Sequence, residues 1–113
     1  MIKQTTLITT MLLGLAACQQ DPVDRQAASI EAAGDNQADA VEADADSRAA
    51  TLRQQASDLE ASASAKTGFE RKQIEIRAKA LRDEAALIAD QGDARAEAIE
   101  AQAEADAKAL RSR

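Results

Sequence analysis

The sequence predicts an all-α fold, an elongated antiparallel hairpin of two helices that pack like a coiled coil. Three observations predict it. Residues 18–113 include 27 alanines but only 13 large apolar residues, which suits long exposed helices and leaves little material for a globular core. The chain has one proline, four glycines and one aromatic residue, so a β-sheet has little to be built from. Finally, the large apolar residues recur at helical spacings in two runs.

The first helix is predicted over residues 22–65. Asp21 is a suitable N-cap in front of Pro22 at the first helical position, and Asp24 adds a negative charge to the first turn. The large apolar residues of this segment are spaced by seven, eleven, eleven and seven positions, and they are Val23, Ile30, Val41, Leu52 and Leu59. Both spacings return to the same side of a helix, so these residues predict a narrow seam flanked by alanine.

The second helix is predicted over residues 68–111. Thr67 precedes Glu70 by three positions, the spacing of a capping box. The large apolar residues of this segment include a run spaced by seven, seven, eleven and eleven positions, which consists of Ile74, Leu81, Ile88, Ile99 and Leu110. The same seam pattern in both helices predicts that they pack against each other.

A turn is predicted near residues 65–68, because the window 62–68 is the weakest helix-forming stretch of the predicted hairpin and ends in a glycine. The alternative is one long helix in a parallel oligomer. Carrying the seam onward from Leu59 by seven or eleven residues would place Lys66 or Glu70 in its interior, where a charge is unfavourable without a partner. We therefore favour the hairpin.

Folding the chain back at Lys66 and Thr67 predicts which residues face each other. Val41 would lie opposite Gly92, and Ile99 opposite Gly34, so each glycine would make room for a bulky side chain. Alternatively, each glycine is a tolerated helix defect that costs about 1 kcal/mol relative to alanine.

An internal repeat also runs through the chain. Residues 23–53 align without gaps on residues 81–111 and match at 13 of 31 positions, seven of them alanine. The offset is close to a whole number of helical turns. The repeat is therefore compatible with both a hairpin and a continuous helix.

Charge is unevenly distributed. Residues 21–60 carry ten acidic and three basic residues, whereas residues 61–113 carry ten of each. Six basic residues cluster in and directly after the predicted turn, and they are Lys66, Arg71, Lys72, Arg77, Lys79 and Arg82. This basic tip is either a solvated helix surface or a binding surface for an anionic partner, such as cell-wall carboxylates or an acidic protein face.

The residues offer little catalytic chemistry. The chain has no histidine, tyrosine or tryptophan, and Ser64 with Lys66 would be a nucleophile and base in an exposed turn without a pocket. A calcium loop is not expected among the carboxylates of residues 35–46, because Ala40 stands where the EF-hand pattern needs glycine. The net charge of −6 disfavours nucleic-acid binding. The sequence thus predicts a non-enzyme without cofactor, metal or nucleic-acid partner.

The N-terminus carries the sharpest motif. Lys3 precedes an apolar stretch over residues 7–15, which is far shorter than the about 20 residues of a membrane-spanning helix. The stretch ends in Leu15, Ala16, Ala17 and Cys18. This run resembles the lipobox of bacterial lipoproteins. The resemblance implies a signal peptide over residues 1–17, recognised by its peptidase at residues 15–17, a lipidated cysteine at position 18, a short linker over 18–21 and a helical hairpin over 22–111.

The resemblance implies a lipid-anchored protein of the bacterial cell envelope. Gln19 after the cysteine resembles the sorting pattern for the outer membrane, so a position facing the periplasm is expected. The remaining chain is similar in composition to the murein lipoprotein family of small alanine-rich helical proteins. This likeness implies a structural tether or scaffold that contacts an envelope protein, the cell wall or further copies of itself. The alternative is a small membrane-active or stress-type lipoprotein whose amphipathic helices contact the bilayer, but such helices usually have a broad apolar face.

Overall fold

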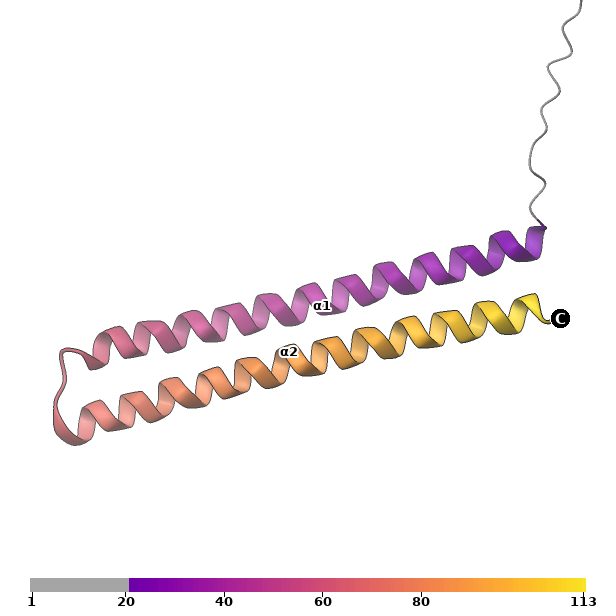
Figure 1. Cartoon of the computed structure of the whole chain (residues 1–113). Helices are drawn as coiled ribbons and strands as arrows, with labels where there is room; N and C mark the ends of the chain where they lie inside the picture. Colours follow the sequence, from indigo (N-terminus) through magenta and orange to yellow (C-terminus); the bar gives the residue numbers. More distant parts are fainter. Residues whose placement is uncertain (1–20) are drawn as a thin grey trace, which may run out of the picture.

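The computed structural model describes residues 21–113, which form two long antiparallel helices joined by a short turn (Figure 1). α1 spans Pro22–Ala63 and α2 spans Gly68–Arg111. The hairpin measures 70 × 14 × 7 Å, and no strand occurs in the described range. The predicted all-α hairpin is confirmed. The chain turns back and does not continue as the single long helix of the alternative prediction.

The start of α1 is capped as the sequence predicts. The Asp21 carboxylate accepts a hydrogen bond from the backbone N–H of Val23 at 3.0 Å, and Pro22 occupies the first turn. α1 ends at Ala63, two residues before the predicted end. There the hydroxyls of Ser62 and Ser64 donate to backbone carbonyls of the last turn, at 2.7 and 2.6 Å. These bonds engage carbonyl groups of the helix end, some of which have no partner inside the helix.

The turn comprises residues 64–67. Ala65 and Lys66 donate backbone hydrogen bonds to the end of α1 at 3.3 and 3.0 Å, and Gly68 has a φ of 63°. This left-handed backbone conformation favours glycine and reverses the chain. Thr67 stands at the N-cap position of α2 but makes no side-chain capping bond. The N-terminal end predicted for the second helix is therefore confirmed, whereas the predicted capping box is not formed.

The centre of the seam consists of alanine and glycine, which corrects the prediction that large apolar residues line it and alanine flanks it. No side chain larger than alanine is fully buried in the described range. The large residues of both predicted runs are half-buried at the sides of the seam, apart from the exposed Val23. The buried residues of α1 are Ala27, Gly34, Ala38, Ala45, Ala49, Ala56 and Ala63, and those of α2 are Ala78, Ala85, Gly92, Ala96, Ala103 and Ala107.

The two glycines mark the closest approach of the helices. A Cβ added to Gly34 would overlap the Cβ of Ala103, and one added to Gly92 would overlap the Cβ of Ala45. The prediction that each glycine receives a bulky side chain is therefore wrong, because the alignment is displaced by four residues, about one helical turn. Small residues meet small residues here, and the backbones come together.

The observed register explains the rest of the seam. In both glycine contacts the residue numbers add up to 137. Carried along both helices, this register sets a small residue opposite a large one in the neighbouring layers, for example Ala38 opposite Ile99 and Leu52 opposite Ala85. Alternation of small and large side chains fills the space between two helices without voids.

The internal repeat has a structural counterpart. Gly34 and Gly92 are equivalent residues of the repeat, and so are their partners Ala103 and Ala45. The two halves of the hairpin therefore make the same glycine–alanine contact twice, related by a local two-fold axis between the helices. The repeat corresponds to a symmetry of the seam.

Three ion pairs join the helices at their edges, and the longest is that of Arg111 with Asp24 at 3.8 Å. Near the turn, the Arg82 guanidinium forms a bidentate pair with the Glu60 carboxylate. At the other end, the Arg111 guanidinium donates to both carboxylate oxygens of Glu31, at 2.7 and 3.3 Å. Hydrogen bonding from the arginines holds the pKa of both glutamate carboxyls below their ordinary value of 4.5. The ion pairs thus couple the fold to pH.

We expect the hairpin to lose stability in acid through the Glu31 and Glu60 pairs. A carboxyl with a lowered pKa stabilises the folded state above its ordinary pKa, and this contribution is lost as pH falls from about 4.5 through the lowered value. Glu31→Gln combined with Glu60→Gln should lower the melting temperature at pH 7 and flatten its dependence on pH below 5. Thermal unfolding followed by circular dichroism from pH 7 to pH 2.5 measures both.

The control for this experiment is Glu42→Gln combined with Glu97→Gln. Both glutamates are exposed and form no ion pair among residues 21–113. This variant should retain the acid sensitivity of the wild type. Equal flattening in both variants would show that the interhelical pairs are not the source of the pH dependence.

Candidate functional site

The basic tip lies at the turn end of the hairpin. Lys66 belongs to the turn, and the other five residues, Arg71, Lys72, Arg77, Lys79 and Arg82, lie in the first half of α2. The opposite end, which we call the open end, contains the start of α1 and the end of α2 (Figure 1). The fold therefore places the basic tip at the opposite end of the molecule from the point where the chain enters the hairpin.

Most of the positive charge of the basic tip is paired. Lys66 contacts Glu70 at 3.9 Å, Arg71 contacts Glu75 at 3.0 Å, Lys79 contacts Asp83 at 2.7 Å, and Arg82 pairs with Glu60. Within residues 21–113, Lys72 and Arg77 form no ion pair. The six predicted residues thus divide into four that pair with acidic side chains, of which only Arg82 reaches across to α1, and two that form no ion pair in the described range.

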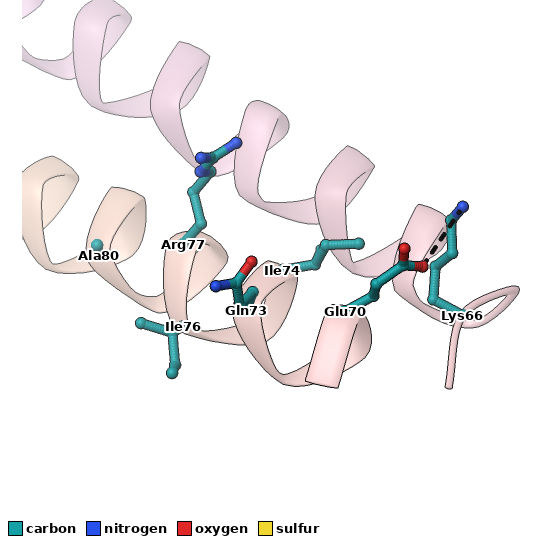
Figure 2. Close-up of a pocket in the computed structure, with 7 residues that line it drawn as sticks. All are labelled: Lys66, Glu70, Gln73, Ile74, Ile76, Arg77 and Ala80. Atoms are coloured by element: carbon teal, nitrogen blue, oxygen red, sulfur yellow. Dashed lines mark ion pairs between the residues drawn. The ribbon is translucent and has the colours of Figure 1, made fainter. Parts of the chain in front are cut away.

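An open groove of about 590 Å³ follows α2 beside the turn (Figure 2). Figure 2 shows Lys66 reaching from the turn to Glu70, while Ile76 and Arg77 extend from different sides of the helix. The groove is lined by Lys66, Glu70, Gln73, Ile74, Ile76, Arg77 and Ala80. It combines a cationic group with aliphatic surface, which suits an extended ligand with acidic and apolar groups.

Three large apolar side chains are exposed on α2, and the predicted seam does not include them. Phe69 is 76% exposed, Ile76 is 61% exposed and Leu87 is 56% exposed. They are spaced by seven and eleven residues, like the seam, but lie on the other side of the helix. The signal was present in the sequence as a second set of these spacings, out of phase with the first.

The candidate catalytic residues contact other groups, and the candidate metal-binding carboxylates lie apart from one another. The Ser64 hydroxyl donates to the carbonyl of Ala61 at 2.6 Å, and Lys66 faces Glu70, so the two do not act together. The carboxylates of residues 35–46 are exposed along α1. Among residues 21–113, no three potential ligands come together as a metal site requires.

The lipobox and its surroundings lie outside the described residues. This concerns the predicted signal peptide, residues 1–17, the peptidase recognition residues Leu15, Ala16 and Ala17, the lipidation site Cys18, and residues 18–20 of the linker. In the part that is described, neither helix has a stretch long and apolar enough to cross a bilayer. Comparison with protein-family models, curated proteins and solved structures finds no match to this chain.

Proposed function

We propose that this protein is a lipid-anchored structural element of the bacterial cell envelope that holds a binding surface away from the membrane. The observation that carries the proposal is the position of the basic tip, at the turn end of a hairpin that is 70 Å long. α1 begins at Pro22, four residues after Cys18, so a lipid on that cysteine would attach almost directly to the open end. Two or more acyl chains would hold the protein stably on a membrane.

The surface presented at the tip favours binding over catalysis. Lys72 and Arg77 carry charges without an intramolecular partner, and Phe69 and Ile76 expose apolar area beside them. Such a combination suits an acidic partner that also offers apolar contacts, for which charge steers the encounter. We place this partner in the envelope, with the anchor in the outer membrane and the tip in the periplasm.

Photocrosslinking in intact cells tests the proposal. A photoreactive residue at Lys72 should capture an envelope protein or a wall fragment, identified by mass spectrometry. The matched control is the same residue at Lys108, which lies 36 residues away, about ten turns, on the same side of α2 but at the open end. The control should not give that adduct.

Two results would contradict the proposal in different ways. If Lys72 captures only lipid or its own chain, the tip does not bind an envelope partner. If a Cys18→Ser variant stays in the membrane fraction as the wild type does, the lipid anchor is not what attaches the protein. The two parts of the proposal can therefore fail separately.

A further inference from the structure

The outer face of α2, turned away from α1, carries its own apolar stripe. Ile76 precedes the buried Ala78 by two residues and Leu87 follows the buried Ala85 by two, which places both about 200° around the helix from the seam. Phe69, Ile76, Leu87, Ala94 and Ala105 follow each other at spacings of seven, eleven, seven and eleven. Asp83, which pairs with Lys79, interrupts this line between Ile76 and Leu87. We define the five apolar residues as the outer stripe. It repeats the spacing by which α2 packs on α1.

The charges beside the outer stripe are divided along α2. Residues 66–82 contain six basic and two acidic residues, whereas residues 83–106 contain eight acidic residues and one basic residue. Two α2 helices in parallel would set like charges against each other, which is unfavourable, whereas two antiparallel helices set basic against acidic halves. The face is therefore complementary to itself under a two-fold rotation.

We propose that this face binds a second copy of the chain in antiparallel orientation, with Ile76 against the partner's Leu87. The same alignment places Phe69 opposite the partner's Ala94. The overlap of residues 69–94 would be about 39 Å long. The two hairpins would then overlap at their turn ends, with their open ends at opposite ends of the dimer.

The charged residues without intramolecular partners support this alignment. Lys72 and Asp90 are 18 residues apart, about five turns, and so lie on one side of the outer stripe. Arg77 and Glu84 are seven residues apart, about two turns, and lie on the other side. None of the four forms an ion pair within residues 21–113. In an antiparallel pair, flanking residues of the same side face each other, so Lys72 meets the partner's Asp90 and Arg77 meets the partner's Glu84.

A second copy suits this face better than α1 does. On α1 the exposed large apolar residue is Val23 at the open end, with 37% exposure. The outer face of α1 instead carries small and polar residues such as Ala32, Ala43 and Ser57. The apolar area and the divided charge occur together on α2 alone, which makes the contact α2 to α2.

Disulfide trapping tests the dimer with the full chain carrying Cys18→Ser. Ile76→Cys combined with Leu87→Cys should give a covalent dimer on mild oxidation. Positions 76 and 87 are about 16 Å apart along one helix, too far for a disulfide within one chain. For the same reason neither single variant should crosslink to itself in the antiparallel dimer. The matched control is Ala32→Cys combined with Ala43→Cys, an exposed pair with the same spacing on α1.

A charge exchange tests the alignment. Added to the double-cysteine variant, Lys72→Asp should reduce the rate of dimer trapping about tenfold. Adding Asp90→Lys should restore it, and because the two residues lie five turns apart in one chain, restoration requires contact between chains. Failure to restore trapping, trapping no stronger than in the α1 control, or dimers of the single Ile76→Cys variant would overturn the proposal. The dimer would cover Lys72, Arg77 and Ile76, so a second copy and an envelope partner would compete for the basic tip. None of these trapping outcomes depends on lipidation.

Discussion

Gly92→Ala is expected to lower the free energy of unfolding by about 2 kcal/mol, because the added methyl group would overlap Ala45 at the closest approach of the helices. In an exposed helix the same substitution stabilises by about 1 kcal/mol, since alanine is the better helix former. The sign of the effect therefore reports the packing. Thermal and urea unfolding followed by circular dichroism measures it.

The control for Gly92→Ala is a double variant in which the partner alanine across the seam is replaced by glycine. Gly92→Ala combined with Ala45→Gly moves the methyl group from one helix to the other and should regain most of the lost stability. The symmetry of the repeat predicts the same behaviour for Gly34→Ala combined with Ala103→Gly. A stabilising effect of Gly92→Ala alone would show that the helices do not approach each other closely at this layer.

Ala85→Asp should destabilise the hairpin even more than Gly92→Ala. Ala85 is fully buried, and the register sets it opposite Leu52. An unpaired carboxylate at this place should cost about 3 kcal/mol or more, and domains of this size have only about 5–15 kcal/mol in total. We expect a large loss of helical signal at 37 °C in circular dichroism.

The neighbouring Ala86→Asp is the control for Ala85→Asp. Ala86 is exposed, so the same residue at this position should lower stability only by the difference in helix propensity, about 0.7 kcal/mol or less. The two variants have the same composition and net charge and nearly the same helix propensity. Similar stabilities would contradict the buried alanine seam.

Much of the fold could be predicted from local signals. Asp21 and Pro22 mark the start of α1, Gly68 marks the turn, and the seven- and eleven-residue spacings identify the side on which each helix packs. The register could not be predicted in the same way. The register depends on how closely the two backbones approach. The spacing of the large apolar residues does not report this distance, because alanine and glycine occupy the centre of the seam. Alignments differing by one helical turn use nearly the same faces, and only packing decides between them.

The basic tip was predictable as a cluster, but its pairing was not. The pair between Glu60 and Arg82 joins residues 22 apart in the chain and depends on the register. The exposure of Phe69, Ile76 and Leu87 follows from their phase relative to the seam, which becomes clear only when the seam is known.

The position of both helix ends at the open end determines how the molecule would respond to mechanical force. A pull on the turn against the start of α1 acts along the backbone of one continuous helix, which cannot lengthen without breaking its contacts with α2. A pull that separates Asp21 from Arg113 instead peels the helices apart one layer at a time, starting with the pairs of Arg111 with Asp24 and Glu31. The hairpin thus resists a force along α1 strongly and yields layer by layer to a force that separates the two helix ends at the open end.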